Sequence, residues 1–149
     1  MTDRKLNIVN RRAKYDYHIH TTFVAGVSLV GTEVKSIRDN KVNLQDAFAY
    51  FRSDNELWMK GLHISLFKEG SHNNHDPIRE RQLLLQKQEL RKLRTKGKEK
   101  GYSIALLRIF ENDRGIIKFE IGIGSGKKQF DKRHDLKEKD IKRQIERYD

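Results

Sequence analysis

The sequence predicts a mainly β protein, a small antiparallel barrel of about five or six strands with one long and one short helix. Two features favour this fold. Most apolar residues fall in short runs that alternate with polar residues or face each other across polar turns, which is typical of antiparallel strands. Only one segment has the length and pattern of a crossover helix, whereas a parallel sheet needs a crossover between successive strands.

The first predicted strand is YDYHIHTTFV (residues 15–24), in which polar and apolar side chains alternate. This period of two indicates a strand with one buried and one exposed face. After it, Thr32 is placed to cap a short helix that runs through Ile37 and Arg38. Glu33 would lie in the first turn of this helix, where the positive end of the helix dipole favours a carboxylate.

Two hairpins account for the other predicted strands. The first pairs residues 47–51 with residues 57–59, and the second pairs residues 104–110 with residues 116–123. The segment GIGSGKK (122–128) overlaps the end of the last strand, but it lacks the spacing of a phosphate-binding P-loop. Its glycines are expected to let the strand bend or end.

The long helix is expected between the two hairpins. Asp76 is a favoured N-cap residue and Pro77 suits the first helical position, so the helix would begin there. Gly97 or Gly101 would end it. At helical spacing, the leucines at 83, 90 and 93 share one side, which predicts a core-facing stripe.

Two further leucines, Leu84 and Leu85, flank or oppose that stripe. One of the two is therefore expected to be partly exposed beside Arg81, Arg91 and Lys92. The alternative is a second contact with the core, and the sequence leaves this choice open.

The positive charge of the chain is unevenly distributed. There are 32 Lys and Arg against 21 Asp and Glu, a formal net charge of +11. Residues 1–14 carry a net charge of +4, residues 79–100 carry +6 and residues 126–149 carry +3, while the β-like remainder is near neutral. Charge segregated in this way indicates a polyanionic partner, with RNA or DNA as the first candidate. A merely soluble basic protein is the alternative.

Composition excludes several classes of protein. The chain has no cysteine, which rules out disulfides, thiolate zinc sites and cysteine nucleophiles. No apolar run approaches the roughly 20 residues that span a bilayer. The basic N-terminus lacks the apolar block of a secretory signal. We therefore expect a small cytoplasmic protein without a membrane partner.

The predicted organisation is a barrel domain with helices over residues 1–127 and a basic C-terminal tail over residues 128–149. The tail has too few large apolar residues to become ordered by itself. Its residues Ile141, Ile145 and Tyr148 nevertheless recur at helical spacing. We expect a tail that is mobile when free and helical against a partner, the alternative being a helix packed permanently on the barrel.

Catalysis is not expected. His72, His75 and Asp76 lie close together and could serve a metal-dependent nuclease, but they fit no zinc signature. Loop histidines beside a capping aspartate are the simpler explanation. His18 and His20 would share the polar face of a strand, which is more typical of a solvated or RNA-facing surface. We therefore predict no enzymatic activity, no metal and no cofactor.

RNA recognition needs cations for phosphates, and amides, hydroxyls or planar groups for bases and riboses. Three segments supply such groups. They are Asn10, Arg11 and Arg12; Glu33, Lys35, Ser36 and Arg38 with Lys41 and Asn43; and, on the long helix, Arg79, Arg81, Lys87 and Arg91. These residues alone lead to a barrel that binds structured RNA or a ribonucleoprotein.

Six blocks of sequence resemble those of a known family. The blocks are NRRAKYDY (10–17), GTEVKSIR (31–38), KVNLQDAF (41–48), HDPIRERQLLL (75–85), GKKQFDKR (126–133) and LKEKDIKR (136–143). In this order they resemble small protein B, the family of bacterial tmRNA-binding (SsrA-binding) proteins. The resemblance implies an oligonucleotide-binding-like β-barrel. It also implies that the protein binds the tRNA-like domain of tmRNA and delivers it to stalled ribosomes in trans-translation.

The resemblance further implies which residues meet each partner. The expected RNA-binding residues are Asn10, Arg11, Arg12, Glu33, Lys35, Ser36, Arg38, Lys41, Asn43, Leu84 and Gln86. The tail residues expected to meet the decoding centre and the empty mRNA channel are Lys127, Lys128, Phe130, Asp131, Lys132, Arg133, Lys137, Lys139, Lys142 and Arg143. One copy of the protein is expected on each tmRNA.

Two positions depart from the usual pattern of that family. Val24 stands where many members have glutamate, and Gln86 stands where many have asparagine or histidine. Val24 cannot form a hydrogen bond through its side chain, whereas Gln86 keeps an amide with a longer reach. These changes bear on individual contacts. A general RNA-binding or ribosomal protein, for which the tail is only an electrostatic anchor, is the alternative function.

Overall fold

The computed structural model describes residues 5–69, 74–99 and 101–127. The helices among these residues are α1 (Arg11–Asp16), α2 (Gly31–Arg38) and α3 (Lys87–Gly97). The strands are β1 (Asn7–Val9), β2 (Tyr17–Val27), β3 (Val42–Asn43), β4 (Phe48–Ser53), β5 (Glu56–Lys60), β6 (His63–Ile64), β7 (Arg81–Leu84), β8 (Tyr102–Glu111) and β9 (Ile117–Gly126). None of these helices is long and apolar enough to cross a membrane.

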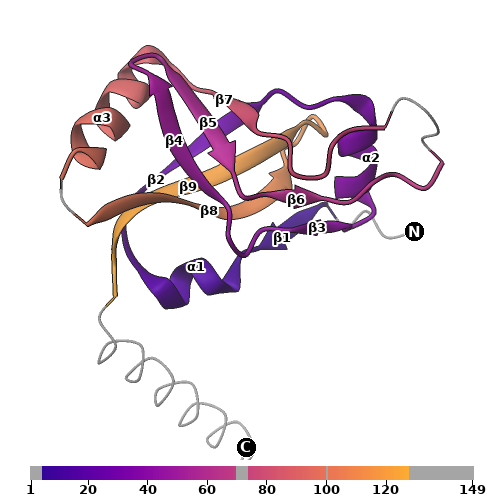
Figure 1. Cartoon of the computed structure of the whole chain (residues 1–149), viewed down its shortest axis with the longest axis horizontal. Coiled ribbons are helices and arrows are strands. Elements are labelled where there is room, and N and C mark those ends of the chain that lie inside the picture. The colour runs from indigo at the N-terminus through magenta and orange to yellow at the C-terminus, as the bar shows by residue number, and fades with distance from the viewer. Residues whose placement is uncertain (1–4, 70–73, 100, 128–149) are drawn as a thin grey trace, which may run out of the picture.

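The main sheet is antiparallel and closes on itself. Its strand order is β1-β8-β4-β5-β7-β2-β9, and β9 also pairs with β8. Six strands therefore form a ring, while β1 is added along the end of β8 that β4 does not reach. Helices α3 and α2 lie towards opposite ends of this ring (Figure 1). The predicted mainly β, antiparallel fold is confirmed, and both expected hairpins are present as β4–β5 and β8–β9.

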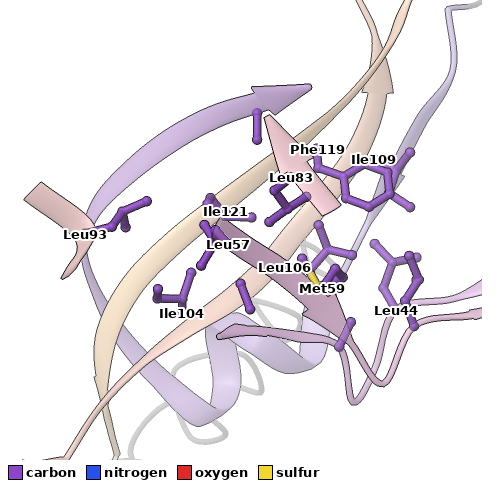
Figure 2. Close-up of a cluster of buried hydrophobic side chains, with 14 of the residues drawn as sticks. Leu44, Leu57, Met59, Leu83, Leu93, Ile104, Leu106, Ile109, Phe119 and Ile121 are labelled. Carbon is purple, nitrogen blue, oxygen red and sulfur yellow. The ribbon is translucent and has the colours of Figure 1, made fainter. Parts of the chain in front are cut away.

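The core fills the inside of the ring. Alternate residues of each strand point inward and meet side chains from the other strands, as Figure 2 shows. Leu57 and Met59 of β5, Leu106 of β8 and Phe119 of β9 are completely buried. Leu93 of α3 joins the same cluster and covers one end of it. The buried members of this core come from strands, helices and loops between Ala25 and Ile123, so the core joins segments that are far apart in the chain.

Two glycines of β9 permit the close approach of neighbouring strands. A Cβ atom on Gly124 would lie 2.1 Å from the carbonyl oxygen of His18, and one on Gly122 would lie 2.8 Å from the side chains of Ile19 and Leu107. The pairing of β2 with β9 is irregular between Ile19 and Thr21. These glycines were expected to let the strand bend or end. In the structure they leave the space in which β2 and β8 pack closely against β9.

The predicted long helix is wrong in its first half. Residues 81–84 form β7, which pairs with β5 and β2, and α3 begins only at Lys87. In β7, Arg81 and Leu83 are buried while Leu84 is exposed, which is the alternation of a strand. Pairing with two neighbours therefore overrides the local helical preference of this segment. The predicted end of the helix at Gly97 is confirmed.

Two smaller features differ from the expectations, and the choice between Leu84 and Leu85 is settled. Thr32 does not cap α2; the N-cap residue is Val30, whose N–H donates to the Glu33 carboxylate at 3.0 Å. The first strand begins at Tyr17 rather than at residue 15, because α1, which was not predicted, ends at Asp16. Of the two leucines left open, Leu84 is exposed and Leu85 packs partly against the core.

Candidate nucleic-acid interface

A buried ionic cluster lies beneath helix α2. The Glu33 side chain is completely buried, and its carboxylate accepts hydrogen bonds from Arg81 Nε at 2.6 Å and from Arg79 Nη2 at 2.5 Å. Arg81 is also completely buried, although its exposure beside RNA was expected. One carboxylate thus joins α2 to β7 and to the segment before it. We call Glu33, Arg79 and Arg81 the ionic cluster.

All three nitrogens of the Arg81 guanidinium form hydrogen bonds. Its Nη1 donates to the carbonyl oxygen of Leu62 at 2.7 Å, and its Nη2 donates to those of Pro77 and Asp76 at 3.2 and 3.4 Å. A buried guanidinium is tolerated only when it is paired and hydrogen-bonded in this way. Arg81 therefore fixes the backbone at Leu62 and at Pro77 against β7, and because it is completely buried it presents no donor at the surface.

The cluster is charged at neutral pH. Burial by itself raises the pKa of the Glu33 carboxyl, but the hydrogen bonds from Arg79, the Val30 N–H and Arg81 outweigh it. The pKa of Glu33 therefore lies below its ordinary value of 4.5. Burial lowers the pKa of Arg81, and the contact with Glu33 opposes this shift.

The outer side of α2 presents the cations that were expected there. Lys35 is exposed and lies over the ring of Phe67, with 5.4 Å between Nζ and the ring centroid. Arg38 donates to Glu111 at 3.0 Å and to the carbonyl oxygen of Gly115 at 2.7 Å, which ties α2 to the β8–β9 turn. Lys41 is exposed just beyond the helix.

Three of the expected RNA-binding side chains are buried rather than exposed. Ser36 on α2 is 1% exposed and Glu33 is fully covered. Asn10 is 5% exposed, and its amide group donates to the carbonyl oxygens of Leu44 and Leu106 at 2.9 and 2.8 Å. The expectation of surface exposure is therefore wrong for these three. The physical reason is that each faces inward from an element whose other side is solvated.

Two other expected cations lie beside a shallow groove. Arg11 and Arg12 are exposed on α1, and the groove between α1 and β3 brings them next to Asn43. Arg12 forms an ion pair with Asp16 at 3.1 Å. The Asn43 carboxamide oxygen accepts the Gln45 N–H at 2.9 Å, and Asn43 is exposed. The structure therefore brings the first and second predicted segments together.

A separate exposed patch lies where β7 meets α3. Leu84 is 54% exposed, and it stands opposite Gly26 of β2 in the antiparallel register. Val24, two residues earlier on β2, is 50% exposed. Gln86 follows Leu84 as the exposed N-cap residue of α3. We call Val24, Gly26, Leu84 and Gln86 the Leu84 patch. The two positions that depart from the family pattern thus belong to the same patch.

The histidine that could have served a nuclease is engaged inside the fold. His75 is 7% exposed, and its two ring nitrogens lie 2.8 Å from the Thr32 hydroxyl and from the Ile64 carbonyl oxygen. Because a carbonyl only accepts, Nε2 donates to Ile64. His72 lies outside the described residues. Among the residues that are described, no group of three or more metal-ligating side chains comes together.

The tail lies almost entirely outside the described residues. Lys127 alone of the expected tail residues is included, and its backbone N–H donates to the carbonyl oxygen of Asp16 at 2.8 Å. The predictions for residues 128–149, and the division of the chain at residue 127, stay predictions.

Two arrangements were not predicted from the sequence. One is the pairing of Glu33 with Arg81, which lie 48 residues apart. The other involves Arg52, whose guanidinium lies 3.6 Å from the ring centroid of Trp58. For the pairing of Glu33 with Arg81, the one local signal was the alternation of Arg79 and Arg81 with other polar residues. For the contact of Arg52 with Trp58 there was no local signal.

Known proteins resemble the chain over nearly its full length. A family model described as "SmpB protein" matches residues 7–148. The SsrA-binding protein of Phocaeicola vulgatus is 48% identical over 147 residues, which cover 99% of this chain and 97% of that protein. The SsrA-binding protein of Bacillus cereus (strain AH820) is 49% identical over 138 residues, which cover 93% and 88%. A chain from the solved structure "tmRNA-SmpB: a journey to the center of the bacterial ribosome" is 44% identical with a TM-score of 0.70, covering 83% of this chain and 86% of that chain.

Proposed function

The chain belongs to the SmpB family of SsrA-binding proteins, and on this premise we propose that it binds tmRNA and acts in the rescue of stalled ribosomes by trans-translation. It contacts the tRNA-like domain of tmRNA and delivers that RNA to the ribosome, where its tail reaches the decoding centre and the empty mRNA channel. The protein acts as one copy per tmRNA in the cytoplasm. It binds no cofactor or metal and catalyses no reaction of its own.

The exposed Leu84 carries this proposal. A leucine that is 54% exposed on a strand fixed from the inside by Arg81 is available to pack against an RNA surface. Arg81 and Leu84 belong to the same short strand, so the ionic cluster holds the Leu84 patch in a defined position. Exposed apolar side chains in a basic region are a feature of RNA contact surfaces, where they pack on bases and riboses.

We divide the proposed RNA site into contacting and positioning residues. The contacting residues are Arg11, Arg12, Lys35, Arg38, Lys41, Asn43, Leu84 and Gln86, all of which are at least partly exposed. The positioning residues are Asn10, Glu33 and Ser36, whose side chains are buried. The first group supplies charge, amides and an apolar contact. The second group acts on RNA affinity only through the shape of the first.

The tail forms the proposed ribosome-binding part of the protein. Its expected residues from Lys127 to Arg143 are mostly cationic, which suits ribosomal RNA in a channel. We propose that Phe130 stacks on a base of the decoding centre. Order in the tail would then be supplied by RNA contacts, so the helix forms where no message occupies the channel. Removal of residues 131–149 should leave tmRNA binding intact and abolish rescue.

A competition titration tests the proposal. The full-length protein is titrated with the tRNA-like domain of tmRNA at about 150 mM salt, with an ordinary tRNA and an RNA duplex of equal length as competitors. We expect a marked preference for the tRNA-like domain. Leu84→Ala should weaken that binding about tenfold, because truncating a packed leucine removes roughly 1–2 kcal/mol of apolar contact. Leu66→Ala is the matched control, since Leu66 is 55% exposed and lies outside the Leu84 patch.

The same titration contains the result that would reject the proposal. Equal affinity for all three RNAs would mean that the net charge of +11 binds RNA without selectivity. A general RNA-binding or ribosomal protein would then be the better description. An equal loss of affinity in the Leu84 and Leu66 variants would remove the Leu84 patch from the site.

A further inference from the structure

A groove opens where strands β4 and β8 separate. The two strands pair only through Phe48 with Ala105 and Ala49 with Ile104, so the rest of β4 has no partner on this side. A cavity of about 530 Å³ lies between them and extends to the C-terminal end of α3. This groove is distinct from the Leu84 patch on β7 and β2, because β5 lies between β4 and β7 and β9 lies between β2 and β8 around the ring.

Aromatic side chains form one wall of the groove. Phe48 is 42% exposed, and its ring lies 6.5 Å from that of Tyr50 at an angle of 49°. Both residues come from β4, and Tyr102 of β8 lines the opposite side. An exposed aromatic side chain on a strand gives a base a surface to stack on.

Arg52 stands at the edge of the same groove in a fixed orientation. Its guanidinium lies 3.6 Å from the ring centroid of Trp58. Its Nε donates to the Tyr50 hydroxyl at 3.0 Å, and its Nη2 donates to Glu80 at 2.8 Å. No described residue accepts a hydrogen bond from Nη1. One planar face and several donors of an already ordered arginine are therefore available.

The charges around the groove favour an anion. Arg94 and Lys98, one turn apart on α3 and its C-cap, line the groove together with Arg52. Arg94 is held by a hydrogen bond to the carbonyl oxygen of Asp54 at 2.7 Å. The carboxylates close to these cations are Asp54, in the lining, and Glu80, which orients Arg52. Cations beside exposed aromatic rings are the combination that binds single-stranded nucleic acid.

We propose that this groove binds a short unpaired RNA segment, whose bases stack on the Phe48 ring and on the Arg52 guanidinium and whose phosphates meet Arg94 and Lys98. The site is additional to the proposed contacts with the tRNA-like domain, and it rests on the proposed function only in that RNA is the partner. An acidic peptide could satisfy the cations, but it would leave the aromatic wall without a matching planar group.

The single tryptophan of the chain reports on the groove. Trp58 is the one tryptophan in the sequence and lies directly under Arg52. The full-length protein is titrated with the oligoribonucleotide rA6 at about 100 mM salt. We expect a saturable change in Trp58 emission that parallels binding measured by the polarisation of labelled rA6. Binding of rA6 without a change in emission would overturn the proposal, as would no binding.

Two variants test the roles of the groove residues. Phe48→Ala removes the stacking wall, and Arg52→Lys keeps the charge but removes the planar guanidinium, so each should weaken rA6 binding about tenfold. The matched controls are Ile116→Ala, because Ile116 is 50% exposed in the β8–β9 turn, and Arg114→Ala in the same turn. Wild-type affinity in Arg52→Lys would overturn the proposal, and so would equally tight binding of hexaglutamate.

The outcome is separable from that of the proposed function. Arg52→Lys should bind the tRNA-like domain as the wild type does, because Arg52 lies outside the Leu84 patch. Selective binding of the tRNA-like domain without the rA6 response would reject the groove alone. An rA6 response without that selectivity would reject the proposed function and leave the groove standing.

Discussion

Glu33 and Arg81 lie 48 residues apart in the chain, and both side chains are completely buried, with Arg81 Nε 2.6 Å from Glu33 Oε2. This pair joins helix α2 to strand β7 of the ring. A charged pair at such depth is stable only because Nη1 and Nη2 of Arg81 also donate to carbonyl oxygens. The position of the Leu84 patch therefore depends on a contact that no RNA touches.

Glu33→Gln should destabilise the protein strongly. The amide keeps the size of the side chain but leaves two guanidiniums, one of them buried, without a counter-charge. Removing one partner of a buried ion pair costs about 3–5 kcal/mol, which urea denaturation would measure directly. Glu56→Gln is the control, because Glu56 is exposed on β5 and its change should alter the free energy of unfolding by less than about 0.5 kcal/mol. A loss below about 1 kcal/mol for Glu33→Gln would contradict this account.

The same carboxylate should make stability depend on pH in the acid range. The pKa of Glu33 is lower in the folded protein than its ordinary value of 4.5, so the unfolded chain binds the proton more readily. The stabilising contribution is complete above the unfolded pKa and is lost as the pH falls below about 4.5 through the folded pKa. Urea denaturation of wild type and Glu33→Gln between about pH 3 and pH 7 would measure it. The variant should show a shallower dependence, and parallel curves would exclude Glu33 as the cause.

The predicted strands and the missed strand differ in how local their signals are. The hairpins β4–β5 and β8–β9 are apolar runs on either side of a polar turn, and each strand pairs with its neighbour in the chain, so the runs and the turns were sufficient to find them. Strand β7 is only RQLL, and its partners β5 and β2 are far away in the chain. This segment is rich in helix-forming residues, but it forms a strand because it pairs with both β5 and β2 and so completes the ring. That requirement is visible only once the other five strands are in place.

In the candidate site, too, some features could be predicted from the local sequence and others depend on distant contacts. The sequence identified residue types that suit RNA, and Lys35, Lys41 and Leu84 are indeed accessible. Asn10 and Glu33 have equally suitable side chains, yet both face inward. Composition and spacing cannot distinguish a polar residue that meets RNA from one that satisfies buried backbone groups. Only the positions of the carbonyl and guanidinium partners separate the two roles.

Gly124 should tolerate no side chain. A Cβ atom there would lie 2.1 Å from the His18 carbonyl oxygen, a backbone atom that cannot turn away. Gly124→Ala must separate β2 from β9 and should lower the free energy of unfolding by about 1–3 kcal/mol, a fall of several degrees in Tm. Gly126→Ala, on the same strand, is the control because a Cβ atom at that position would have nothing within 4 Å of it. Equal Tm values for the two variants would show that the strands are less closely packed than described.

Asn10→Asp separates a structural role for this residue from a role in RNA contact. The change keeps the oxygen that accepts the Ala13 N–H at the start of α1, but it removes the NH2 group that donates to Leu44 and Leu106. A carboxylate buried against two carbonyl oxygens is unfavourable, so the free energy of unfolding should fall by about 2–4 kcal/mol. Denaturation measures this loss, and titration with the tRNA-like domain under conditions where the variant is folded measures the affinity. A residue that only positions its surroundings loses stability first, and affinity changes by less than about threefold. Full stability with a large loss of affinity would instead mean that Asn10 turns outward to meet RNA.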